Sequence, residues 1–489
     1  MKAAISNSLS FLGARSNGAQ TAAQRSSECL SSAPLATSQE VLLKGAEVAP
    51  KMKKVLVVSF DFPPYRTSAV YRMTGLTKYL PQFGWQPTVL TIQLAQGDQD
   101  PKMLEKLPPE VRVVRTRYLR ISDWENSTAS VVRSLGGLRS APSATRQSRF
   151  DRCLRSLGEL VRSTLYFPDH TLGWIPFALA KAIQLQRDRP FDLIYTTSPP
   201  RSAPVIGSLF KTLCGVPWIL EFMDPWYSPN RPLRRQFENW LQALMLRQAN
   251  RVVVMTKGHA GELRRSYHVA DAKLSVIRNG FDEDDFNSAH ASATDFLEPG
   301  YLHLSHFGTI YPNHSGNFFH ALTELARECP DVKERLRVNI IGYPDEDVQR
   351  YASEGELKDI IRIHGYIEHQ DALQVMRSSH CLLVFLGHRD FSRLAVSSKT
   401  YEYLRAGRPI LALTYEGELK ELVKEARAGW VVQPNDTEAT KQVLKTLLSG
   451  SRNDGPPRPA QPEFVAQFRY DRLAAQLAGI FNEAVSDDH

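Results

Sequence analysis

Short apolar runs and longer amphipathic segments alternate along most of the chain. The apolar runs are typical of buried strands and the amphipathic segments of helices. Residues 54–60, for example, are almost continuously apolar, as expected for a strand covered on both faces of a sheet. Strands that alternate with helices are joined by right-handed crossovers into parallel sheets. The pattern therefore predicts an α/β protein.

The predicted elements form two series. The first has strands at 54–60, 88–92, 193–197, 218–222, 252–256 and 274–277, with helices at 71–83, 174–187, 203–214, 233–249 and 258–267. The second has strands at 302–307, 336–341, 360–364, 381–386, 409–413 and 430–433, with helices at 317–328, 346–354, 370–378, 398–406, 418–427 and 438–449. Two doubly wound, Rossmann-like domains of this kind place a ligand in a central cleft, at the carboxyl ends of their strands.

Changes in composition predict four parts of the chain. Residues 1–50 are rich in Ser and Ala, make a poor signal peptide and are expected to be a disordered tail. Residues 51–285 form the predicted N-terminal domain and residues 286–462 the predicted C-terminal domain. Residues 463–489 hold a last amphipathic helix, which we expect to pack back toward the N-terminal domain.

The positive charge is concentrated in one stretch. Between residues 111 and 162, eleven arginines stand against four acidic residues, so nearly all of the net charge of +8 lies there. We expect this basic insertion, residues 111–165, to hold loops and one or two surface helices. It suits an anionic membrane surface or a phosphate-bearing substrate, and a solvated basic loop is an equally good interpretation. Nucleic acid is disfavoured because no recognition motif accompanies the charge.

The composition also limits the kind of protein and the compartment that the sequence predicts. The hydrophobic fraction of 42% with 23% charged residues excludes a globally disordered chain. No apolar run approaches the roughly 20 residues that span a bilayer. Five scattered cysteines, an odd number, favour a reducing compartment over a disulfide framework. We therefore expect a cytoplasmic protein that can lie on the inner face of the membrane.

The most informative segment is residues 396–413. Ser397 and Ser398 suit the start of a helix, whose free N–H groups and partial positive charge attract a diphosphate. Lys399 adds a full charge there. Glu402 lies three residues further on and can accept the two hydroxyl hydrogen bonds that a ribose offers. The alternative is that Glu402 only complements the helix dipole while Lys399 is solvated.

This segment resembles the donor-binding signature of glycosyltransferase family 4, the retaining transferases of GT-B fold. In relatives the pattern reads roughly Pro-Ser-Lys-x-Tyr-Glu-Tyr-x-Ala-x-Gly-x-Pro, and the glutamate holds the nucleotide ribose. The resemblance implies that Glu402 has this role, with Ser397 and Ser398 beside the donor. Lys399 would then stabilise the charge of the departing nucleoside diphosphate.

The likeness extends along nearly all of residues 53–485. Residues 59–65 look like the first strand and loop of the family, residues 276–282 like its hinge motif, and residues 306–309 like its first C-domain strand and turn. It implies donor contacts from four residues of these motifs: Arg278, Asn279, Gly308 and Thr309.

Asp224-Pro-Trp226 resembles an element of bacterial polysaccharide members of the family. It makes Asp224 the candidate catalytic group that faces sugar or acceptor, with an Asp that caps the next turn as the alternative. Trp174 and Trp226 could stack on sugars, and His306 could contact the donor. All three residue types are more often part of a core.

Three departures from the family pattern affect the site. The first loop lacks the usual glycine pair, so Arg66 and Arg72 could supply the anion contacts. The first acid of the family's glutamate pair is here Leu394, which Asp390 or Arg393 could replace. The Arg and Lys that follow residues 306–309 in relatives are missing too, so that the diphosphate clamp must come from Lys399, the helix start or another basic residue such as Arg278.

No cofactor or metal is expected. Metal-dependent transferases carry an Asp-x-Asp triplet at a strand end, whereas Asp345-Glu-Asp347 occurs where a helix should begin. We therefore expect metal-independent transfer from a nucleotide-sugar donor to a glycan or lipid-linked acceptor, with retention, in surface polysaccharide or lipopolysaccharide biosynthesis. Two alternatives stay open: a sugar-nucleotide epimerase or hydrolase of the same fold, and a non-catalytic GT-B scaffold protein.

Overall fold

The structure is a computed structural model of the 489-residue chain. It describes residues 52–93, 99–119, 167–226, 232–288, 296–450 and 460–487. The predicted tail 1–50 and most of the basic insertion lie outside the described residues. Residues 51–489 form one compact unit.

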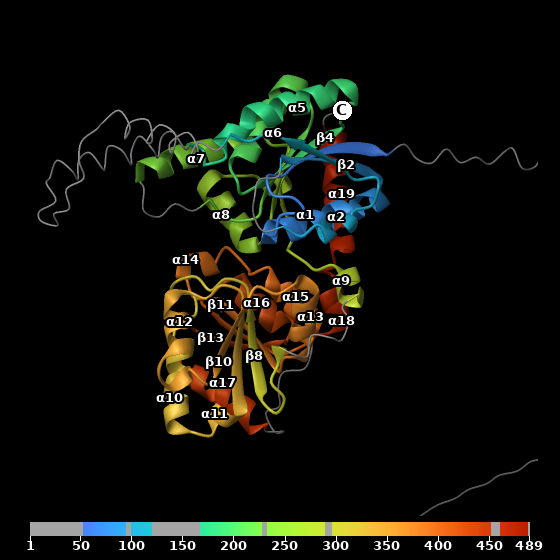
Figure 1. Ribbon diagram of the computed structural model, residues 1–489. Coiled ribbons are helices and arrows are strands. Elements are labelled where there is room, and N and C mark those ends of the chain that lie inside the picture. The colour runs from blue at the N-terminus through green and yellow to red at the C-terminus, as the bar shows by residue number, and fades with distance from the viewer. Residues whose placement is uncertain are drawn as a thin grey trace, which may run out of the picture. The chain divides into compact units, whose positions relative to one another are not determined.

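The first series of elements builds a seven-stranded parallel sheet in the order β3-β2-β1-β4-β5-β6-β7 (Figure 1). Its strands are β1 (Lys53–Val58), β2 (Trp85–Ile92), β3 (Arg112–Thr116), β4 (Leu193–Ser198), β5 (Trp218–Phe222), β6 (Arg251–Val254) and β7 (Leu274–Val276). Strand order reverses between β1 and β4, which is the switch point where doubly wound folds leave a crevice.

The second series builds a six-stranded parallel sheet in the order β10-β9-β8-β11-β12-β13. Its strands are β8 (Leu302–Phe307), β9 (Leu336–Ile341), β10 (Ile361–Gly365), β11 (Cys381–Leu386), β12 (Ile410–Thr414) and β13 (Gly429–Val432). Here the order reverses between β8 and β11. The prediction of two doubly wound α/β domains is confirmed.

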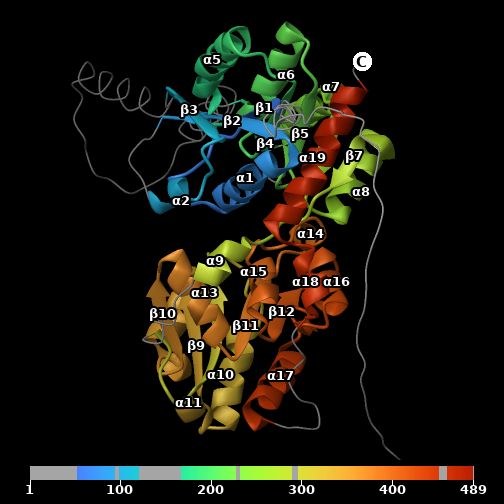
Figure 2. The same cartoon turned by 90° about the vertical axis from the view of Figure 1, so that its right-hand side faces the viewer.

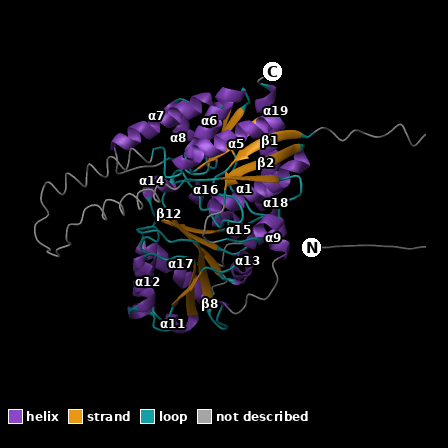
Figure 3. Ribbon diagram, turned by 45° about the horizontal axis from the view of Figure 1, so that its top comes forward, coloured by secondary structure: helices purple, strands orange, loops and turns teal. Residues whose placement is uncertain are grey.

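Helices surround both sheets (Figure 3). The first sheet carries α1 (Ser68–Tyr79), α2 (Lys102–Glu105), α5 (Ile175–Asp188), α6 (Ser202–Cys214), α7 (Pro232–Gln248) and α8 (Lys257–Tyr267). Then α9 (Glu283–Ser288) leads to the second series: α10 (Phe318–Glu328), α11 (Val332–Arg335), α12 (Glu346–Ser353), α13 (His369–Ser378), α14 (Arg389–Ser392), α15 (Lys399–Ala406), α16 (Glu418–Glu425) and α17 (Thr437–Ser449). The chain ends with α18 (Pro462–Ala466) and α19 (Tyr470–Ser486).

The prediction of loops and surface helices for the basic insertion is wrong at the start of this segment. Arg112–Thr116 is not loop or helix but the edge strand β3. Val114 and Thr116 lie on one face and are buried, whereas Arg115 between them is half-buried on the other face. The single last helix that we predicted is also divided, into α18 and α19.

Helix α19 returns to the first sheet and packs against α1 (Figure 2). Leu473, Leu477 and Phe481 join the core that includes Val55 and Trp85. The two helices approach so closely at Gly75 that a Cβ there would lie 2.2 Å from the Tyr470 ring. The predicted domain boundaries themselves stay a prediction.

Candidate functional site

Helix α15 begins at Lys399 and ends at Gly407, which has a positive φ of 70°. Ser398, at the N-cap, makes no side-chain cap bond. The N–H groups of Thr400 and Tyr401 donate to Ser397 and Ser398 oxygens, respectively. Among the described residues, no group accepts a hydrogen bond from the amides of Ser398 and Lys399. Two N–H groups therefore remain available at the positive end of this helix.

Glu402 is buried, with 8% of its surface exposed. Its Oε2 lies 2.8 Å from Lys399 Nζ and its Oε1 lies 3.2 Å from His369 Nε2. Burial alone would raise the pKa of Glu402, but the Lys399 charge and the His369 hydrogen bond lower it to about 2. Lys399 is thus paired rather than solvated. The carboxylate is ionised and keeps further acceptor positions for a ligand.

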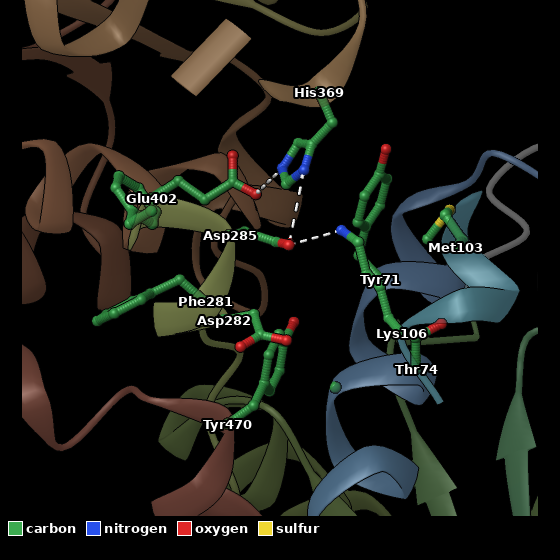
Figure 4. Close-up of a pocket in the computed structure, with 12 residues that line it drawn as sticks. Tyr71, Thr74, Met103, Lys106, Phe281, Asp282, Asp285, His369, Glu402 and Tyr470 are labelled. Atoms are coloured by element: carbon green, nitrogen blue, oxygen red, sulfur yellow. Dashed lines mark hydrogen bonds and ion pairs between the residues drawn. The ribbon is translucent and has the colours of Figure 1, made fainter. Parts of the chain in front are cut away.

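A chain of polar contacts continues from His369 to the N-terminal half (Figure 4). His369 Nδ1 lies 3.7 Å from Asp285 Oδ2, and Asp285 Oδ1 lies 2.6 Å from Lys106 Nζ. The ring of Tyr71, on α1, lies 4.7 Å from the His369 ring, centroid to centroid. Sequence reasoning missed these partners, because nothing in their spacing links positions so far apart.

The pocket beside Glu402 is small. Its volume is about 20 Å³, room for about one water molecule, and its walls include Tyr71, Thr74, Asp285 and His369. Lys399 Nζ also lies 5.3 Å from the centroid of the Tyr71 ring, so the tyrosine covers the lysine–glutamate pair.

Two predicted ligand contacts, Arg72 and Asn279, are buried in the structure. Arg72 is 1% exposed; its Nη2 lies 2.6 Å from Glu221 Oε1, and its Nη1 donates to the carbonyl of Arg278 over 2.7 Å. Asn279 is 3% exposed, and its Oδ1 accepts a hydrogen bond from the Tyr470 hydroxyl over 2.9 Å. Both side chains form hydrogen bonds that hold the hinge together, and their roles as ligand contacts stay predictions.

The other two predicted basic contacts lie where the two halves meet. Arg278 Nε is 2.9 Å from Glu418 Oε1, and the Arg278 side chain is 13% exposed. Arg66 Nη2 is 3.3 Å from Glu368 Oε1, and its guanidinium lies 4.6 Å from the centroid of the Tyr366 ring. Arg66 therefore bridges from the first loop to the segment before α13.

Gly308 and Thr309 leave an open turn after β8. Gly308 has a φ of 117°, and a Cβ there would meet nothing within 4 Å. Thr309 is exposed, as a ligand contact must be. His306, at the end of β8, is 7% exposed and bonds the Leu383 carbonyl through Nδ1, while Nε2 has no partner among the described residues. Burial lowers the pKa of His306 to about 4, so the ring is neutral.

Asp224 follows the end of β5. Its side chain reaches solvent, yet the protein around it raises the pKa of the carboxyl by desolvation. No described residue donates a hydrogen bond to its carboxylate. Trp226 is partly buried and donates from Nε1 to Ser198 Oγ over 2.7 Å, whereas Trp174 is fully buried in the core.

The structure has a second and larger cavity, of about 520 Å³. One of its lining residues is Pro225, which directly follows Asp224 in the sequence. Its walls include Pro225 and Trp226, parts of α7 and α8, and Asp390, Arg393 and Leu394. The two residues that we considered as replacements for the missing acid at Leu394 therefore line this cavity.

The acidic triplet 345–347 begins a helix, as predicted. Asp345 is the N-cap of α12 and accepts a hydrogen bond from the Val348 amide. In the described part of the chain no group of three or more His, Cys, Asp or Glu side chains could hold a metal ion. Within the same residues no helix has the length and apolar character of a membrane span. The three described cysteines, Cys214, Cys329 and Cys381, are free.

The structure has two doubly wound domains that are joined by a hinge. A helix start and an ionised glutamate lie where the domains meet. These features together define the GT-B class of protein. Comparison with known proteins specifies the family. Residues 69–280 match the model of a glycosyl transferase 4-like domain, and residues 306–450 match the model of glycosyl transferases group 1. The chain belongs to glycosyltransferase family 4.

Curated relatives are distant. The chain is 26% identical to D-inositol 3-phosphate glycosyltransferase of Streptomyces scabiei over 265 residues, which is 50% of this chain and 56% of the relative. The enzyme of the same name from Streptomyces avermitilis is 24% identical, over 48% of this chain and 52% of the relative. The chain thus spans little more than half the length of these relatives.

Solved structures agree in fold. Sucrose-phosphate synthase of Thermosynechococcus elongatus superposes with a TM-score of 0.59 at 15% identity, covering 89% of this chain and 100% of the other. HepE of Anabaena, solved in complex with UDP, superposes with a TM-score of 0.58 at 15% identity, covering 88% of this chain and 100% of the other.

Proposed function

We propose that this protein transfers a sugar from a nucleotide-sugar donor to a glycan or lipid-linked acceptor. One observation carries the proposal: Glu402 is kept ionised by Lys399 and His369 in the first turn of a helix whose first amides are unused. A carboxylate beside free N–H groups and a lysine suits a ribose attached to a diphosphate.

In the proposed reaction the free amides of α15 and Lys399 hold the diphosphate, and Glu402 holds the ribose. The bond between the anomeric carbon and the phosphate oxygen breaks, and a bond from that carbon to an acceptor hydroxyl oxygen forms, with retention. Lys399 and the helix dipole stabilise the leaving group, so that no metal ion is needed. Asp224, whose pKa is raised, is the candidate acceptor of the hydroxyl proton.

Surface polysaccharide or lipopolysaccharide assembly is the proposed setting. Its support is the Asp224-Pro-Trp226 element and a fold shared with WaaG, described as a glycosyltransferase involved in lipopolysaccharide biosynthesis (TM-score 0.51, 12% identity). In this setting the arginines of residues 111–162, eight of which lie outside the described residues, would hold the protein on anionic lipid at the inner face of the membrane.

A thermal-shift screen with UDP-, GDP- and dTDP-sugars tests donor binding first, because a ligand that binds the folded state raises the melting temperature. The best donor is then given, radiolabelled, to pure protein with and without membrane extract. We expect label in a glycan or glycolipid only with the extract. Donor consumption without acceptor would identify an epimerase or hydrolase instead, and binding without turnover a scaffold.

Glu402→Gln is the matched site variant, and Glu421→Gln, at an exposed position of α16, is its control. We expect the first to reduce the donor-induced shift and the second to leave it unchanged. Equal shifts in both variants would remove Glu402 from the donor site and with it the basis of the proposal.

A further inference from the structure

The 520 Å³ cavity is large enough for a mono- or disaccharide, since ligand sites commonly measure about 300–1,000 Å³. It is lined from both halves of the molecule, by α7 and α8 on one side and by Asp390, Arg393 and Leu394 on the other. Trp226 provides an aromatic wall, and the Tyr267 hydroxyl, bonded to Gln242, provides a polar one. Aromatic and amide groups together are typical of saccharide sites.

The charges in the walls are unequal. Arg235, Lys257 and Arg393 are exposed, and no ion pair joins any of them to another described residue. Of the acids in the walls, Glu238 is paired with two arginines outside the cavity and Glu262 with Arg265. Asp390 is therefore the one acid of the described lining without an ion-pair partner, whereas three cations of the lining have no such partner.

Backbone contacts bring the chain positions of two of these cations close together. The Thr256 hydroxyl donates to the Leu394 carbonyl over 2.7 Å, and a Cβ on Gly258 would lie 2.1 Å from the Arg393 carbonyl. The start of α8 therefore touches the segment that follows α14, with Lys257 on one and Arg393 on the other. Glu418, the acid next to this contact, is engaged by the Lys257 amide and by Arg278.

From this placement we infer that the cavity binds the acceptor, and that the acceptor is an anionic saccharide, one that carries a phosphate or a carboxylate. The inference rests on the proposed transferase function. Arg393 and Leu394 line the cavity and come directly before residues 396–413, the segment that holds Glu402, so a saccharide in this cavity lies close to the proposed donor site. A neutral acceptor would not require this excess of unpaired cations.

Calorimetric titration of the full chain with glucose 6-phosphate, glucuronate and glucose tests the inference. We expect both anionic probes to bind at least about tenfold more tightly than glucose, since a hydrogen bond to a charged group discriminates by that much. Arg393→Gln and Lys257→Gln should each weaken the anionic probes by about tenfold and leave the binding of glucose unaffected.

Arg264→Gln is the control, because Arg264 lies on the same helix as Lys257 but pairs with Asp271 outside the cavity. Equal binding of the three probes, or equal effects of Arg264→Gln and Lys257→Gln, would overturn the inference.

The two proposals fail separately. If donor binds and is turned over but anionic probes have no advantage, the acceptor inference is wrong and the transferase stands. If no nucleotide sugar binds while the anionic probes still depend on Arg393, the transferase proposal fails and the anionic site remains.

Discussion

Replacing Glu402 by glutamine removes a charge while keeping the shape of the side chain. In the wild type the pKa of this carboxyl falls from 4.5 to about 2, although burial acts in the opposite direction. A difference of this size between folded and unfolded chain corresponds to about 3 kcal/mol of folding free energy at neutral pH. The amide cannot form an ion pair with Lys399, so the variant should lose a stabilisation of this order.

The loss should depend on pH in a defined direction. A carboxyl whose pKa is lowered by folding stabilises the protein above its unfolded pKa, and the stabilisation disappears as the pH falls toward the folded value. The difference in unfolding free energy between wild type and Glu402→Gln should therefore be about 3 kcal/mol at pH 7 and shrink between pH 4.5 and pH 2.

Urea unfolding of both proteins at pH 7, 5, 4 and 3 measures this difference. Glu421→Gln serves as the control, because Glu421 is exposed and should show a small difference at every pH. A difference for Glu402→Gln that is below about 1 kcal/mol at pH 7, or that stays constant down to pH 3, would refute the electrostatic argument for this site.

Three further variants test other parts of the structure. Lys399→Ala should lower kcat about a hundredfold with a smaller change in donor affinity, since the lysine acts on leaving-group charge; an unchanged kcat in steady-state assays would contradict this role. Arg72→Leu should cost about 3–5 kcal/mol because it strands the buried Glu221, and Arg72→Leu with Glu221→Leu should recover part of the loss; additive losses in urea unfolding would show that the pair is not coupled. Gly75→Ala should lower the melting temperature although alanine favours helices, because its Cβ would collide with Tyr470; a raised melting temperature would show that α1 and α19 do not pack this closely.

Local periodicity was sufficient to predict most of the fold. The strands are buried on both faces and therefore appear as apolar runs, and each helix carries an apolar face. Strand β3 was missed because its sequence, Arg-Val-Val-Arg-Thr, has only two apolar residues and lacks the apolar run of a strand buried on both faces.

The candidate site was only partly accessible to sequence reasoning. Lys399 and Glu402 lie one helical turn apart, so their spacing predicts that they meet. His369 meets Glu402 only through the packing of α13 against α15, which no spacing rule contains. Arg72 looked like an anion contact, but its partner Glu221 lies 149 positions away on a strand, so its burial could not be foreseen.

The return of α19 to the first sheet has a consequence for synthesis on the ribosome. Helix α19 supplies Leu473, Leu477 and Phe481 to a core whose other members, such as Val55 and Trp85, are made at the beginning. The half of the molecule that emerges first therefore keeps one apolar face uncovered until nearly all of the polypeptide has been translated. A nonsense codon before Tyr470 should leave the later-made half folded and expose the earlier one to chaperones and proteases.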